Sequence, residues 1–226
     1  MDEGVAVSLK PDVEASVERL NAVLAGVDDE GVRAPSGLPG WSRGHVLTHV
    51  ANFSEGMTRQ VDEARAGRLV EMYDGGRPAR DAAIEAGSGR PADELRSHVR
   101  TASAGLLAAW GKVDDWSLPV LHRNSHLAAT VYTGWRELEV HTVDLALEPT
   151  SGDWSEEFCL HLLDFLRPRT PDGIHLILDA GDIRWENGTG EDLVLTGALT
   201  DLTAWFAGRS TIRPVAGDLP DLNPWP

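Results

Sequence analysis

Apolar side chains recur at helical spacing through the first two thirds of the chain. A period of about 3.6 residues is typical of helices that bury one face. Residues 12–27 carry one such stripe, and others run onward from Ser42, from Pro91 and from Ser125 to about Leu147. A serine can cap a helix start, and proline suits the first helical turn. We therefore expect four long helices in this part of the chain.

Glycine and proline mark the connections between these helices. The first helix is expected to end before the Pro35–Gly40 segment. A glycine-rich connection from Gly75 to Gly89, passing through Arg80, is expected between the second and third helices. Four helices joined by short or moderate loops indicate a bundle, whose interior can hold a site built from inward side chains.

The composition changes after residues 148–152, which predicts a domain boundary. We expect a four-helix bundle domain at 1–150 and a small α+β domain at 151–226, so the fold class is α+β. The elements expected in the second domain are a helix at 155–167, strands at 174–178, 183–185 and 193–195, and a helix at 199–207. The proline-rich tail from Pro214 is expected to be extended.

The charge balance argues against nucleic-acid and membrane partners. The formal net charge is −16, from 36 acidic and 20 basic residues, whereas nucleic-acid binders concentrate basic residues on one face. The first ten residues lack a basic region followed by an apolar core, and no stretch approaches the roughly 18 apolar residues of a membrane span. The single cysteine, Cys159, cannot form an intramolecular disulfide and is expected to be a small core residue. We expect a cytoplasmic protein.

Glu137 and His141 are the most informative residues of the sequence. They are four residues apart, so in a helix their side chains project from one face with β carbons about 5–6 Å apart. His49 adds an imidazole, because its place beside Val46, Val50 and Phe53 in the second helix points it inward. Two histidines and one glutamate with an open fourth position compose a catalytic zinc site.

Other residues compete for these roles. His45 and His49 also form an i, i+4 pair, although His45 is close to the start of the helix and nearer solvent. Glu139 lies about 160° round the helix from His141, too far to share an ion with it. Asp144 is either an acceptor for the second ring nitrogen of His141 or an exposed charge.

Three arginines, Arg77, Arg80 and Arg209, lie near glycines or loop ends. A guanidinium group is suited to binding a carboxylate, although solubilising surface charge is the simpler interpretation.

Four segments carry a family resemblance: residues 38–51, residues 72–87 around Met72-Tyr73 and Arg80, residues 136–145, and residues 195–209. They resemble the mycothiol-dependent maleylpyruvate isomerase family, whose N-terminal domain resembles the DinB-like metal-binding four-helix bundles. The resemblance spans nearly the whole chain.

The resemblance implies that His49, Glu137 and His141 bind Zn²⁺. It also implies that Arg80 and Arg209 hold a small anionic substrate or the thiol cofactor mycothiol. The implied reaction is the cis–trans isomerisation of maleylpyruvate to fumarylpyruvate, a step in gentisate breakdown.

Two alternatives remain open at this level. One is a metal-dependent transfer of mycothiol to another electrophile, and the other is a binding module without catalysis. The sequence leaves the oligomeric state, monomer or small homo-oligomer, undetermined.

Overall fold

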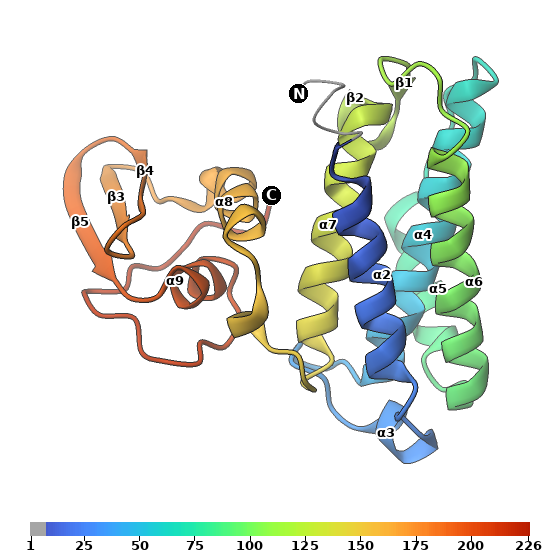
Figure 1. Cartoon of the computed structure of the whole chain (residues 1–226), viewed down its shortest axis with the longest axis horizontal. Coiled ribbons are helices and arrows are strands. Elements are labelled where there is room, and N and C mark those ends of the chain that lie inside the picture. Colours follow the sequence, from blue (N-terminus) through green and yellow to red (C-terminus); the bar gives the residue numbers. More distant parts are fainter. Residues whose placement is uncertain (1–7) are drawn as a thin grey trace. The chain divides into compact units, whose positions relative to one another are not determined.

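A computed structural model describes residues 8–226 of the chain. Residues 1–7, most of the segment inspected above for a targeting sequence, lie outside it. The chain divides into one compact unit that ends at Leu147 and a second that runs from Glu148 to Pro226. The first unit is helical and the second combines helices with a three-stranded sheet (Figure 1), which confirms the predicted α+β class. Within residues 8–226, no helix has the length and apolar character needed to cross a membrane.

Four long helices form the first unit: α2 (Lys10–Leu24), α4 (Arg43–Arg65), α6 (Ala92–Trp110) and α7 (Leu127–Asp144). Helix α4 contacts α6 and α7, and α2 contacts the same two helices. This closed set of contacts is a four-helix bundle, with the long helices side by side in Figure 1. Fully buried apolar side chains from all four helices make the core, among them Leu20, Leu47, Leu95 and Leu127.

The start of α4 is set by a reciprocal cap. The Ser42 side chain accepts from the backbone N–H of His45, and the Nδ1 atom of His45 accepts from the backbone N–H of Ser42 at 3.1 Å. Such a cap satisfies two backbone donors that a helix start otherwise leaves unpaired. It fixes the beginning of the helix that carries His49.

Three local predictions for the first unit were incomplete or wrong. The expected glycine-rich connection is largely a helix, α5 (Gly76–Gly87), which contacts α4. It was missed because its apolar side chains are mostly alanines, of which none is buried and only Ile84 enters the core, and because Gly75, with φ of 83°, precedes it. The short helix α3 (Asp29–Arg33) was not predicted.

Ser125 does not cap the fourth helix. It pairs with Val120 in a two-stranded ribbon of β1 (Pro119–Val120) and β2 (Ser125–His126). Helix α7 starts two residues later, after His126, which makes no side-chain cap.

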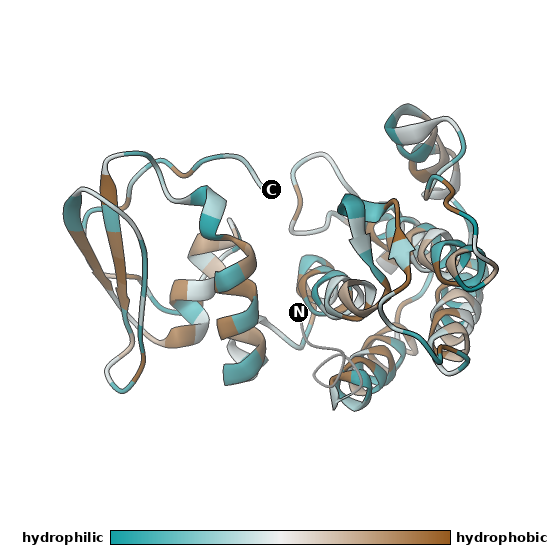
Figure 2. Cartoon of the chain, turned by 90° about the horizontal axis from the view of Figure 1, so that it is seen from above, coloured by the Kyte–Doolittle hydropathy of each residue, from teal (hydrophilic) through white to brown (hydrophobic). Residues whose placement is uncertain are grey.

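The second unit has the sheet order β4-β3-β5 and two main helices. The elements are α8 (Glu156–Phe165), β3 (Ile174–Asp179), β4 (Arg184–Gly188), β5 (Glu191–Thr196) and α9 (Leu199–Phe206). Figure 2 shows α8 and α9 on one side of the sheet, where the rings of Trp185 and Phe206 lie 5.5 Å apart. Apolar side chains of the strands and helices face each other there and form the core of this unit.

Strand β3 is antiparallel to β4 on one edge and parallel to β5 on the other, although only two residues separate β4 from β5. Gly190, with φ of 134°, makes it possible, because a Cβ atom there would lie 2.0 Å from the carbonyl oxygen of Gly173. The chain can therefore pass the start of β3 and pair on its other edge. After α9, residues 214–226 form no helix or strand.

Candidate metal centre

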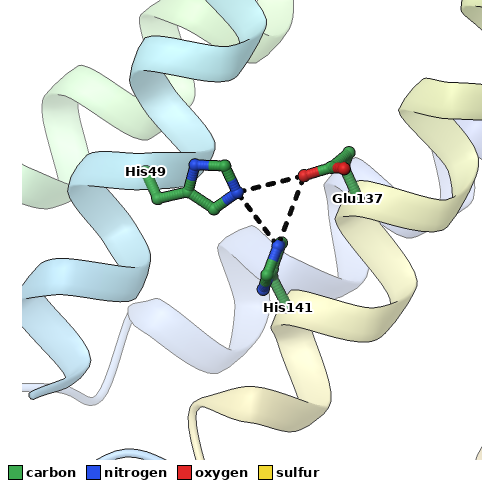
Figure 3. A group of neighbouring side chains, drawn as sticks. All are labelled: His49, Glu137 and His141. Atoms are coloured by element: carbon green, nitrogen blue, oxygen red, sulfur yellow. Dashed lines mark hydrogen bonds and ion pairs between the residues drawn. The ribbon is translucent and has the colours of Figure 1, made fainter. Parts of the chain in front are cut away.

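The side chains of His49, Glu137 and His141 meet inside the bundle. The Nε2 atom of His49 lies 3.1 Å from Oε2 of Glu137 and 3.0 Å from Nε2 of His141. The remaining separation, from Nε2 of His141 to Oε2 of Glu137, is 3.3 Å. Figure 3 shows the triangle of donor atoms between α4 and α7. Of the described residues, these three form the group of histidine and carboxylate side chains that can hold a metal ion.

Secondary structure explains how the three groups meet. Glu137 and His141 are one helical turn apart on α7, so they project from one face. His49 projects from α4, which packs against α7, and its ring edge meets the His141 ring with centroids 4.5 Å apart. The backbone of both helices is hydrogen bonded internally, so the site is held by regular structure rather than by a loop.

The geometry fits a tetrahedral cation. Bonds of about 2.0–2.1 Å at tetrahedral angles place two ligand atoms about 3.3 Å apart. The observed separations of 3.0–3.3 Å are close to this value. Two imidazole nitrogens and one carboxylate oxygen form a donor set suited to zinc, and three protein ligands leave one coordination position for water or another ligand.

A fourth residue orients His141. Its Nδ1 atom lies 2.9 Å from Oδ2 of Asp144, whose side chain is 1% exposed. Asp144 is therefore the acceptor for the second ring nitrogen, the first of the two interpretations of this residue. This contact turns Nε2 of His141 toward Glu137.

The electrostatics of the three groups are coupled. Burial by itself raises the pKa of Glu137, but hydrogen bonds with His141 and His49 hold it well below its ordinary value. Burial by itself lowers the pKa of His141, but Asp144 and Glu137 raise it to about 9. Burial and the neighbouring charge of His141 lower the pKa of His49. Glu137 is thus ionised and ready to bind a cation.

Arg80, on α5, also reaches the site. Its Nη2 atom lies 3.2 Å from Nδ1 of His49, and its Nη1 atom lies 2.7 Å from Oδ1 of Asp81. Because guanidinium groups only donate, Nδ1 of His49 is an acceptor here, and a neutral His49 carries its proton on Nε2. If Nε2 held a cation, the ring proton would be on Nδ1, which could then no longer accept from Arg80.

The competing residues are engaged elsewhere. His45 caps α4 with Nδ1 and lies 3.2 Å from Glu85 through Nε2. Glu139 is buried on another side of α7, where it accepts from Ser16 and Arg19. Cys159 is fully buried in the second unit, as expected of a core residue.

The other two arginines have partners of their own within their units. Arg77 is 87% exposed and lies 3.9 Å from Asp81. Arg209 belongs to the second unit, where it donates to the carbonyl oxygen of Ala207 at 2.7 Å. Its guanidinium carbon lies 4.8 Å from the centre of the Trp225 ring.

Tyr73 was not singled out by the chemistry of the sequence. It interacts with Arg80, and burial raises its pKa to about 12, so its hydroxyl stays protonated. His122 was not singled out either; its Nε2 is buried and has no hydrogen-bond partner among residues 8–226. Burial and the charge of Arg123 lower the pKa of His122 to about 4. Neither residue belongs to the group of side chains that can hold a metal ion. The only signal was for Tyr73, which lies in one of the segments that carry the family resemblance.

Comparisons with known proteins agree with this arrangement. Two crystal structures are similar to the chain: one of the mycothiol-dependent maleylpyruvate isomerase, with a TM-score of 0.87, and one of a histidine-to-alanine mutant of that enzyme, with a TM-score of 0.86. Each is 24% identical in sequence, and each alignment covers 100% of this chain and 98% of the other. No curated protein matches the sequence. Residues 13–146 match the family described as the mycothiol maleylpyruvate isomerase N-terminal domain. Because this match spans more than half of the chain and contains all three donor residues, the chain belongs to that family.

Proposed function

We propose that the protein is a zinc-dependent isomerase that uses mycothiol to convert maleylpyruvate to fumarylpyruvate. The observation that carries this proposal is the triangle of His49, Glu137 and His141 donor atoms, 3.0–3.3 Å apart. Membership of the family and the similarity of fold support it.

The reaction explains why a metal and a thiol are useful together. A double bond rotates only after its π bond is interrupted, which reversible addition of a nucleophile achieves. Bound zinc lowers the pKa of a coordinated thiol, so that mycothiol is a competent nucleophile at neutral pH. Because the thiol comes from the cofactor, Cys159 is not needed, and its full burial suits a role in packing.

The chain's own residues hold the reacting groups in place. Glu137 and the two histidines bind the metal, and Asp144 fixes the ring of His141 through the 2.9 Å contact. Arg80 and Arg209 bind the anionic substrate or the thiol cofactor. Their charge also offsets the net charge of −16, which repels anions at a distance.

Metal content gives a direct test of the site. We expect wild-type protein to retain about one zinc per chain. Glu137→Ala should lose it, because the two remaining histidines, without the negative charge of the carboxylate, bind zinc weakly. Glu139→Gln is the matched control: it removes another carboxylate from α7, one that contacts Arg19 and Ser16 instead of the site. Full zinc occupancy in Glu137→Ala would contradict the proposed site.

Turnover tests the reaction separately from the metal. Zinc-loaded protein with mycothiol and maleylpyruvate should form fumarylpyruvate, and omission of mycothiol should stop the reaction. Loss of free thiol without fumarylpyruvate would instead indicate transfer of mycothiol to an electrophile. The absence of both tightly held zinc and thiol-dependent turnover would indicate a binding module. We further propose a cytoplasmic location, as a single cysteine favours no oxidising compartment.

A further inference from the structure

A second chemical feature of the first unit is a cavity of about 350 Å³ beside the metal centre. It lies between α4, the segment around Met72 to Asp74, and the first turns of α5. Gly56 lets that segment approach α4 closely, since a Cβ atom there would lie 2.9 Å from Cγ of Met72. The polar side chains that line it are Asn52, Glu55, Arg59, Tyr73, Asp74 and Arg80.

Arg80 links this cavity to the metal centre. It lines the cavity while its Nη2 atom lies 3.2 Å from Nδ1 of His49. A ligand group that binds Arg80 from the cavity is therefore separated from His49 by about the width of one guanidinium group. A small molecule can span the distance from the cavity to the metal ligands.

The polar groups of the cavity favour a carboxylate. Arg59 and Arg80 are both present, and each binds a carboxylate side chain: Arg59 binds Asp74 at 2.8 Å and Arg80 binds Asp81 at 2.7 Å. Those carboxylates are 84% and 54% exposed. Exposed ion pairs of this kind contribute little free energy, so an incoming carboxylate can replace them.

Two further donors point to the same chemistry. The Tyr73 hydroxyl interacts with Arg80 and is a donor for a carboxylate oxygen. Helix α5 starts at Gly76 without a side-chain cap, so its first N–H groups add positive potential near Ala79. Glu55, which also lines the cavity, is held by His98: Arg90 donates to Nδ1 of that ring at 2.9 Å, and Nε2 donates to the Glu55 carboxylate at 2.8 Å.

We propose that this cavity is a carboxylate subsite, in which Arg59, Tyr73 and Arg80 bind the end of a dicarboxylate substrate that lies away from the metal centre. The proposal rests on the proposed function and extends it: the substrate has a carboxylate at each end, one near the metal and one in the cavity. Arg80 then leaves His49 for the substrate, as cation binding at His49 also requires.

Binding of succinate, an unreactive dicarboxylate, tests the subsite without turnover. We would follow backbone amide shifts during titration of metal-free and zinc-loaded protein. We expect the shifts to concentrate on α4 near Asn52 and Arg59 and on residues 72–83. Succinamide, which has the same length but no charge, should bind at least about tenfold more weakly.

Three variants locate the binding site. Arg59→Ala should raise the succinate Kd about tenfold or more, and Arg59→Lys should restore part of the affinity. Tyr73→Phe should raise the Kd about two- to fivefold. Arg65→Ala is the matched control, since it removes the same charge from α4 outside the cavity and should change the Kd less than about twofold. Thermal unfolding of each variant checks that it is folded.

Two results would overturn the subsite. One is an unchanged succinate Kd in both Arg59→Ala and Tyr73→Phe, and the other is succinamide binding as tight as that of succinate. Because the metal-free protein is included, failure of the subsite is distinguishable from failure of the zinc-dependent reaction, which shows as absent zinc or absent mycothiol-dependent turnover.

Discussion

Asp144 and His141 are joined by a buried hydrogen bond, with 2.9 Å between Oδ2 and Nδ1. They are three residues apart near the end of α7, so one helix holds both the proposed ligand and the group that orients it. A carboxylate that accepts from one ring nitrogen fixes the tautomer and makes the other nitrogen a better metal ligand. The affinity of His141 for a metal ion therefore depends on Asp144 at the end of the same helix.

Asp144→Asn should lower zinc affinity by about 10- to 100-fold, the usual effect of removing such a partner. Competition with a chromogenic chelator measures this. Asp201→Asn is the matched control, because Asp201 is also a buried carboxylate but accepts from the backbone N–H groups of Ile212 and Arg213 in the second unit. An Asp144→Asn protein with wild-type zinc affinity would remove the orienting role from Asp144.

Arg80→Gln should strengthen zinc binding while it weakens turnover. A glutamine oxygen can accept from the protonated Nδ1 of a metal-bound His49, which a guanidinium cannot do. One hydrogen bond of this kind corresponds to about a five- to tenfold gain in affinity. Arg77→Gln removes the same charge from the exposed face of α5 and should leave zinc affinity unchanged. A weaker zinc affinity in Arg80→Gln would show that Arg80 does not oppose metal binding.

Stability of the metal-free protein should fall as the pH rises from about 6.5 to 9. The pKa of His141 is raised to about 9, so the folded state binds its proton more tightly than the unfolded state does. The resulting stabilisation is complete below the unfolded pKa of about 6.5 and is lost as the pH rises through 9. It amounts to no more than about 3 kcal/mol.

Denaturant unfolding at a series of pH values, with and without a chelator, measures this effect. His141→Gln should flatten the slope of the metal-free protein. With saturating zinc the slope should reverse, because zinc binding requires His141 to lose its proton. A metal-free wild-type protein whose free energy of unfolding, relative to His141→Gln, rises between pH 6.5 and 9 would contradict the assignment.

A pair of glycine substitutions tests the packing of the bundle. Gly134 on α7 lies against Trp110, and a Cβ atom there would be 2.5 Å from Cη2 of that fully buried ring. Trp110 also donates from Nε1 to Thr130 at 2.9 Å, so it cannot easily move. Gly134→Ala should therefore destabilise the protein by about 1–3 kcal/mol.

Gly105→Ala is the matched substitution, inside α6 and with nothing within 4 Å of the added carbon. It should stabilise the protein by about 0.5–1 kcal/mol, because alanine loses less conformational freedom in a helix. Thermal or denaturant unfolding compares the two. Equal effects at both positions would mean that contact with Trp110 does not limit the approach of α7.

Several features could be predicted from the sequence because they depend on local chemistry. The stripe of Val13, Val17 and Leu20 predicts α2, and Ser42 predicts the start of α4, since period and capping act within a few residues. The four-residue spacing of Glu137 and His141 likewise predicts a shared helical face. Helix α5 was not predicted in this way, because it buries only Ile84 and its other apolar side chains are small alanines within a glycine-rich segment.

The sequence by itself determined the four long helices of the bundle, the inward position of His49, and the pairing of a carboxylate with an imidazole one turn apart. Only the tertiary structure decided that His49 meets that pair, that Arg80 lies against His49, and that Arg59 and Tyr73 border the same cavity as Arg80. The physical reason is how far apart along the chain the interacting residues lie. Helix period and capping arise from neighbouring residues, whereas these contacts join α4 to α7 and to α5, and they exist only once the bundle has packed.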